Sequence, residues 1–292
     1  MRSTSLSIAD KINPITRTIY HDIHAATESV GVDWLVVGAT ARDMVYQAAY
    51  NVKIARATAD IDFAVHVEDW ATFSAITEAL IGEYGFSPTR SAHRLKLPAS
   101  DLWVDIIPFG AIAGDDGKYR WPDEPEKEIS ILGFQEALET AVMCRIDDNP
   151  VLDLKIVHPA VLIMIKIISW CDRKHYKRTD AQDAAYAMSY YTLLDGNDTR
   201  VYDDPALYEG DLEMGTIGAR LAGRDLASLA PGLALETVRA FVQREIDLGD
   251  ESEFLADMMR GSTKLFADRR LYRDLLPNLA TGIDEQSEAQ AR

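Results

Sequence analysis

The first half of the chain alternates between two spacings of hydrophobic and polar positions. Residues 5–30 carry apolar side chains at helical spacing, which predicts an N-terminal helix or a pair of helices. The run at 33–38 is short, continuously apolar and ends in glycine, as is typical of a strand buried on both faces. The same reasoning predicts a helix at 39–50, strands at 59–67, 93–98 and 102–110, and a helix at 70–84.

Two local patterns refine the predicted sheet. The strands at 93–98 and 102–110 are separated by a short polar turn, so we expect them to form a hairpin. Pro108 has no backbone N–H, so the second strand is predicted to end near residue 107. Thr40 and Asp43 lie three residues apart, which approximates a capping box and predicts that Thr40 caps the helix that follows.

The second half of the chain has a mainly helical pattern. Residues 114–128 combine Gly, Pro and charge without apolar periodicity and are predicted to form a loop, and a short helix is predicted at 133–146. Further helices are predicted at 159–174, 179–193, 214–229, 233–247 and 252–268, with a frayed last dozen residues. We therefore expect an α+β protein, with a mixed sheet and flanking helices at 1–155 and an all-helical domain at 156–292.

Composition removes several classes of function. The 292 residues carry a formal net charge of −17, which argues against non-specific coating of nucleic acid but is compatible with a local basic groove. The two cysteines, Cys144 and Cys171, have no metal-ligand spacing. The longest apolar run, 159–168, is too short to cross a bilayer and contains a lysine, and the N-terminus lacks an apolar signal core. The sequence therefore predicts a cytoplasmic protein without a membrane span.

Carboxylates occupy positions that the surrounding residues would bury. Asp60 and Asp62 lie in "TADIDFAV", and Asp105 lies in "LWVDIIPF". Residues i and i+2 of a strand point to the same face, so the first two carboxylates are predicted to lie side by side. If the second strand neighbours the first, three hard oxygen donors converge, a set that suits Mg²⁺ or Mn²⁺. The competing interpretation is that Asp-x-Asp forms a turn, a cap or a solvated edge.

The segment "VVGATARD" places a glycine between a buried strand and a helix. Such a glycine lets the backbone approach a ligand closely, and the start of a helix attracts anions, so Gly38 and Thr40 are candidate phosphate contacts. The alternative is a helix cap with a closely packed turn.

Together, "VVGATARD", "TADIDFAV" and "WVDIIPFG" resemble the nucleotidyltransferase superfamily that is typified by DNA polymerase beta. Within it, the sequence is most similar to the bacterial AbiEii-type nucleotidyltransferases, toxins of type IV toxin–antitoxin and abortive-infection defence systems. The positions that match the family motif are Gly38, Asp60, Asp62 and Asp105. Two features depart from it: Ala39 stands where many members have Gly or Ser, and the spacer before Asp60 is long.

The resemblance implies a role for each candidate residue. The catalytic and metal-binding residues would be Asp60, Asp62 and Asp105. The nucleotide-binding residues would be Gly38, Ala39, Thr40, Arg56, Lys166, Arg173 and Lys177. Further candidates are Asp43, Arg94, Asp180 and Asp183.

The basic candidates of the second half depend on the helix that carries them. Lys166 interrupts an apolar helix, and Arg173 and Lys177 would share its face if the helix runs unbroken. The family's Lys-Asp pair is out of register here, because Thr179 precedes Asp180. A solvated helix end is the competing interpretation of these charges.

The resemblance implies a Mg²⁺- or Mn²⁺-dependent enzyme that transfers a nucleotide from a nucleoside triphosphate to a hydroxyl group. The acceptor would be RNA, such as a transfer RNA 3′ end, or a protein, and an antitoxin protein would be a partner. Two alternatives stay open: a small-molecule nucleotidyltransferase of the antibiotic-modifying kind, and a nucleotide- or partner-binding module without turnover.

Overall fold

The computed structural model describes residues 6–53, 60–97, 102–114, 116–122, 124–175, 177–194, 199–208, 213–260 and 267–291. The chain divides into two compact units, one ending at His158 and the other beginning at Pro159. Within the described ranges, no helix combines the length and the apolar character that a membrane crossing requires.

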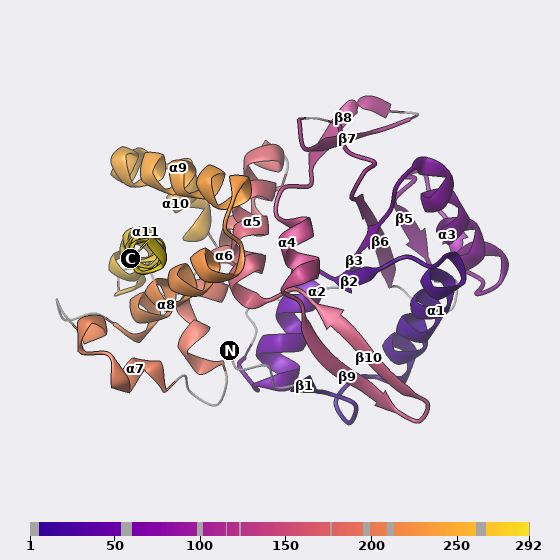
Figure 1. Cartoon of the computed structure of the whole chain (residues 1–292), viewed down its shortest axis with the longest axis horizontal. Coiled ribbons are helices and arrows are strands. Elements are labelled where there is room, and N and C mark those ends of the chain that lie inside the picture. Colours follow the sequence, from indigo (N-terminus) through magenta and orange to yellow (C-terminus); the bar gives the residue numbers. More distant parts are fainter. Residues whose placement is uncertain are drawn as a thin grey trace. The chain divides into compact units, whose positions relative to one another are not determined.

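An eight-stranded mixed sheet forms the core of the first unit (Figure 1). In spatial order its strands are β1 (Leu6–Ser7), β9 (Val142–Asp148), β10 (Val151–Ile156), β2 (Trp34–Val36), β3 (Asp60–His66), β6 (Trp103–Phe109), β5 (Arg94–Lys96) and β4 (Ser87–Pro88). β3 is parallel to β6 and antiparallel to β2. The central strands supply the core, with Leu35, Phe63 and Val104 fully buried.

Helices flank this sheet. They are α1 (Pro14–Val30), α2 (Gly38–Arg42), the π-helix η1 (Asp43–Ala49), α3 (Trp70–Gly82) and α4 (Phe134–Glu139). α1 begins where the Asn13 side chain accepts a hydrogen bond from Thr16 N, and it ends at Gly31, which has φ 75°. α1 and α3 pack against each other (Figure 1).

The predicted architecture is confirmed, and several predicted elements lie where the pattern placed them. The expected strands at 33–38, 59–67 and 102–110 correspond to β2, β3 and β6, and the expected helix at 70–84 corresponds to α3. The predicted hairpin is also present, because β5 and β6 pair antiparallel.

Three predicted element boundaries in the first unit are wrong. The expected loop at 114–128 holds the hairpin of β7 (Lys118–Trp121) and β8 (Glu124–Ser130). The expected helix at 133–146 ends at Glu139, and the chain continues as β9. β6 runs through Pro108 to Phe109. β5 pairs with β6 only as far as Asp105, so Pro108 needs no backbone N–H on the side of the strand that faces β5.

The second unit is helical. It contains α5 (Pro159–Arg173), α6 (Thr179–Ser189), α7 (Arg200–Asp203), α8 (Met214–Leu229), α9 (Leu233–Leu248), α10 (Glu253–Met258) and α11 (Ala267–Ala291). The prediction of a frayed C-terminus is wrong, because α11 continues to Ala291. Gly282 and Gly223 allow α11 and α8 to meet closely: a Cβ on Gly282 would overlap the Arg220 carbonyl group. The predicted helix at 252–268 ends at Met258, and part of that range lies outside the described residues.

Candidate functional site

Three carboxylates lie on one face of two neighbouring strands. In the parallel pairing of β3 with β6, Asp62 lies opposite Asp105 and Asp60 lies opposite Trp103. Residues in register on adjacent strands share a face, as do residues i and i+2, so Asp60, Asp62 and Asp105 project from the same side of the sheet. The side chain of Asp60 is 37% exposed and that of Asp105 is 14% exposed. β3 and β6 are therefore neighbours, which was the condition for the three carboxylates to lie close together.

Arg94 is the cation beside these carboxylates. It lies directly opposite Asp105 in the pairing of β5 with β6. Its Nε and Nη2 donate to Asp105 Oδ1 and Oδ2 at 2.6 and 2.5 Å, and Nη2 is 3.6 Å from Asp60 Oδ2. The hydrogen bonds to Asp105 raise the pKa of Arg94 above its usual value. Both Asp105 oxygens are thus held by a single guanidinium group.

Gly38 touches the Asp62 carboxylate. Its φ is 67°, in the left-handed region, and a Cβ built on it would overlap Asp62 Oδ2. Val37 N, just before it, donates to Asp62 O at 3.0 Å. The turn between β2 and α2 is therefore fixed against β3, and only glycine fits this position without displacing Asp62.

Thr40 fastens α2 to β3. Its hydroxyl donates to Asp60 O at 2.6 Å and accepts from Asp62 N at 3.4 Å. The prediction that Thr40 caps the helix is wrong, because the helix begins at Gly38 and its N-cap is Val37. Thr40 and Ala39 are both buried. The hydroxyl proton of Thr40 is thus engaged by the backbone of β3.

A cavity of about 250 Å³ opens beside Asp60. Its lining includes residues that the sequence pattern did not single out: Asn13, Thr16 and Tyr20 of the α1 region and Met44 and Gln47 of η1. Burial and then the charge of Asp62 raise the pKa of Tyr20, whose hydroxyl lies 3.4 Å from Met44 Sδ. The candidate Asp43 also lines this cavity and pairs with Arg42. The five cavity residues that the sequence pattern missed belong to α1, its N-cap and η1. In the sequence they look like ordinary positions of an amphipathic helix, so nothing in the pattern identifies them as cavity residues.

The other candidates form a separate cluster in the helical unit. Lys166 Nζ donates to Asp180 Oδ1 at 2.9 Å and to Asp183 Oδ2 at 2.8 Å, and the lysine side chain is only 7% exposed. Arg173 Nη2 donates to Asp180 Oδ2 at 2.9 Å. Burial would raise the pKa of Asp180, but the charges of Lys166, Arg173 and Lys177 outweigh it and lower that pKa. The predicted contact of Lys166 with a triphosphate would require this cluster to open.

The predicted basic stripe is not continuous. α5 ends at Arg173, so Lys177 lies beyond the helix that carries Lys166, and Lys177 is exposed. Arg56, the candidate on the long spacer, lies outside the described residues.

The solved structures that are similar to this chain include the following three. The antibiotic-resistance factor ANT(2'')-Ia is 13% identical, with 82% of this chain and 98% of that chain covered and a TM-score of 0.33. A CCA-adding enzyme in complex with ATP is 14% identical, with 97% and 73% covered and a TM-score of 0.28. CdnC from E. coli MS115-1, in complex with HORMA-deltaN, is 12% identical, with 97% and 89% covered and a TM-score of 0.26.

Neither a protein-family model nor a curated protein matches the sequence. At these identities and TM-scores, the activity of a structural neighbour does not carry over to this chain, and the function has to be inferred from the site.

The site offers carboxylate oxygens and the guanidinium group of Arg94. Asp60 and Asp62 lie on one strand face and suit a hard divalent ion, whereas both oxygens of Asp105 already accept from Arg94. Within the described ranges, no group of three or more His, Cys, Asp or Glu side chains is arranged to hold a metal ion. The two carboxylates of Asp60 and Asp62 suit a divalent cation by their chemistry. Asp105 could be a third ligand only if Arg94 moved away from it.

Proposed function

We propose that this protein is a nucleotidyltransferase, which transfers a nucleoside monophosphate from a nucleoside triphosphate to a hydroxyl group. The observation that carries the proposal is the placement of Asp60, Asp62 and Asp105 on one face of β3 and β6, with Gly38 pressed against Asp62. A purely structural sheet has no need for three carboxylates on one face, because like charges at neighbouring positions destabilise it. The order of these residues along the chain also matches the nucleotidyltransferase motif.

Asp60 and Asp62 would hold Mg²⁺ or Mn²⁺ through carboxylate oxygens. The bound ion would neutralise negative charge on the triphosphate and on the leaving pyrophosphate. Gly38 and Ala39 would face the triphosphate with their backbone, and Thr40 would keep Asp60 and Asp62 in place through its hydrogen bond to the β3 backbone.

Arg94 and Asp105 would act as a pair. A guanidinium group binds phosphate oxygens in the same forked geometry that it uses for a carboxylate. When Arg94 transfers from Asp105 to the triphosphate, the Asp105 carboxylate becomes available to accept the proton of the attacking hydroxyl. The hydroxyl oxygen then bonds to the α-phosphorus, the bond from the α-phosphorus to the bridging oxygen breaks, and pyrophosphate leaves.

For the acceptor we propose RNA, such as a transfer RNA 3′ end, or a protein hydroxyl, and for the biological role a toxin of a type IV toxin–antitoxin or abortive-infection system. These finer assignments are supported by the resemblance of the motifs to AbiEii-type proteins. A small-molecule acceptor is the alternative within the same chemistry.

One observation favours a second candidate function, a nucleotide-binding module without turnover. Arg94 holds both oxygens of Asp105, so the third carboxylate of the motif is occupied within the protein. If Arg94 never leaves Asp105, the site can bind a nucleotide at Asp60 and Asp62 but has no group to accept the proton.

The deciding experiment is transfer of label from each α-³²P ribonucleoside triphosphate, with Mg²⁺ or Mn²⁺, to total cellular RNA and to the protein itself. We expect label with the native protein and none with Asp62→Asn. Asp148→Asn is the matched control, because Asp148 is an exposed carboxylate at the end of β9 and should leave transfer unchanged. Nucleotide binding without transfer would support the binding module, and absence of both would refute the proposal.

A further inference from the structure

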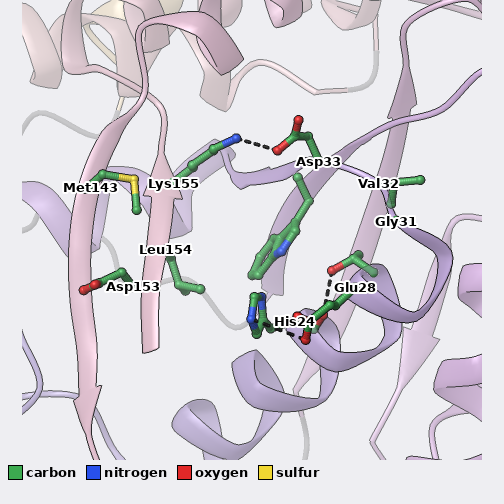
Figure 2. Close-up of a pocket in the computed structure, with 11 residues that line it drawn as sticks. His24, Glu28, Gly31, Val32, Asp33, Met143, Asp153, Leu154 and Lys155 are labelled. Carbon is green, nitrogen blue, oxygen red and sulfur yellow. Dashed lines mark hydrogen bonds and ion pairs between the residues drawn. The ribbon is translucent and has the colours of Figure 1, made fainter. Parts of the chain in front are cut away.

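A second cavity lies near the ends of the central strands that are farther from the candidate site. β10 and β2 share one register pair, Ile156 with Val36, and no other pair joins them among the residues that the structure describes. Beside this pair the two strands and α1 enclose a cavity of about 370 Å³ (Figure 2). Trp34, which lines it, is paired with Val65, five residues along β3 from Asp60 and thus roughly 17 Å away along the strand.

Part of the cavity wall is apolar and aromatic. The Trp34 side chain lines the cavity and is 8% exposed. Its ring meets Phe63 edge-on at a centroid distance of 5.7 Å, which fixes its orientation. Met143 and Leu154 line the side formed by the hairpin. A flat or aliphatic group would therefore find a preformed surface here.

The charged groups around the cavity are mostly acidic. Glu28, Asp33 and Asp153 come from three different segments and line the cavity together with one lysine, Lys155. Lys155 Nζ donates to Asp33 Oδ1 at 2.5 Å (Figure 2), and His24 Nε2 lies 4.0 Å from Glu28 Oε2. Both oxygens of Asp153 accept hydrogen bonds from Arg145, which does not line the cavity. Asp33 and Asp153 are thus each compensated by a cation, and Glu28 supplies the remaining negative charge of the lining.

The end of α1 adds to this negative potential. The C-terminal end of a helix carries the negative pole of its dipole, and lysine or arginine commonly compensates it. The last turn of α1 has no basic residue, and it carries Glu28. The glycine turn at Gly31, which lines the cavity, brings this helix end next to Asp33 and Trp34. The helix end thus favours a cation independently of the carboxylate side chains.

The geometry points to a second ligand site, which takes a small organic cation: an amine or a guanidinium group on a flat or aliphatic stem. The stem packs on Trp34 and Leu154, and the cation lies near Glu28 and the end of α1. The volume is within the range of about 300–1,000 Å³ that is usual for small-molecule sites, and an aromatic face attracts a nearby cation. The site does not depend on the proposed transferase activity.

The test uses the full-length protein and three probes with a shared phenyl stem: 2-phenylethylamine, 2-phenylethanol and 3-phenylpropionate. Binding is followed by the ¹⁵N-labelled indole N–H signals, with Trp34 assigned through Trp34→Phe. We expect the amine to shift the Trp34 signal saturably, and the alcohol and the carboxylate to bind at least tenfold more weakly. Agmatine, which carries a guanidinium and an amine, should shift the same signal.

Variants separate charge from packing. Glu28→Gln and Asp33→Asn should each weaken amine binding about two- to fivefold, as expected for partly solvated charges. Glu78→Gln, an exposed carboxylate of α3 away from the cavity, should leave it unchanged. Asp62→Asn should also bind the amine normally, even if it abolishes nucleotide transfer. Equal binding of all three probes, a preference for the carboxylate, or no shift at Trp34 would each overturn the inference.

Discussion

The exchange of Arg94→Gln tests whether the guanidinium holds the three carboxylates together. The variant removes both hydrogen bonds to Asp105 and leaves Asp62 and Asp105 facing each other in register on adjacent strands. Two unit charges about 5 Å apart repel each other by about 3 kcal/mol at an effective dielectric constant of about 20. Arg94 and Asp60 are about one third exposed, so water screens part of this repulsion. We expect a net loss of about 2 kcal/mol in the free energy of unfolding.

Tryptophan fluorescence is a suitable assay, because four of the five tryptophans lie before His158 and report on the first unit. For a unit of this size, a loss of about 2 kcal/mol lowers Tm by roughly 4–8 °C. Arg90→Gln is the control, because it removes an exposed arginine of the same unit and should change Tm by much less. The double variant with Asp62→Asn should recover about half of the loss, because one of the repelling charges is gone.

The same variant tests the proposed divalent-metal site at Asp60 and Asp62 without measuring activity. Once Arg94 is absent, millimolar Mn²⁺ should raise the Tm of Arg94→Gln more than that of the native protein, because the ion replaces the lost guanidinium charge. An unchanged Tm for Arg94→Gln would show that the guanidinium does not hold the carboxylates together. A loss of stability that Mn²⁺ does not reverse would refute the divalent-cation site.

Three further variants probe neighbouring features. Gly38→Ala should reduce nucleotide transfer at least about a hundredfold with little loss of secondary structure, because its Cβ would displace Asp62, and the circular dichroism spectrum checks the fold. Thr40→Val should cost about 1–2 kcal/mol in urea unfolding, because the backbone at the start of β3 loses its hydroxyl partner. Lys166→Met should cost about 3–5 kcal/mol, because it removes the cation that Asp180 and Asp183 share in a buried site. Asp180 has a lowered pKa in the native protein, so it stabilises the fold above about pH 4 and loses this effect on acidification. The free energy of unfolding of the native protein should therefore fall below that pH. The free energy of unfolding of Lys166→Met should instead rise as the pH is lowered from 7 to 5.

The sequence predicts the centre of the sheet well because burial dominates there. β2, β3 and β6 are short apolar runs in which each aspartate stands out against its neighbours. The loop predicted at 114–128 is wrong for a different reason. Its hairpin is held by a cross-strand ion pair of Arg120 with Glu128 at 2.6 Å and by two buried aromatic residues, Tyr119 and Trp121. The alternation of apolar and charged residues covers only the four residues of β7, which is too short to stand out among the surrounding Gly, Pro and charged positions.

The parts of the site that the sequence does not predict depend on how two elements align or pack with each other. The sequence places Asp60 and Asp62 on one face, because this depends on a single strand. The hold of Arg94 on Asp105 depends on how β5 aligns with β6, and the enclosure of Lys166 by Asp180 depends on the packing of α5 against α6. Both facts are properties of paired elements, which a single run of residues does not encode.

The two ends of the sheet also determine how the protein behaves toward its own copies. Both edge strands are two residues long: β4 contains Pro88, and β1 covers only Cys144 and Arg145 of β9. An incoming strand therefore finds only two strand residues to pair with on β4 and on β1. Trimming the chain past Ser7 would uncover Cys144 and Arg145 as well, so that the longer β9 would become the edge strand and a template for stacking. The placement of the N-terminal cut in an expression design would thus decide whether the protein stays dispersed at high concentration.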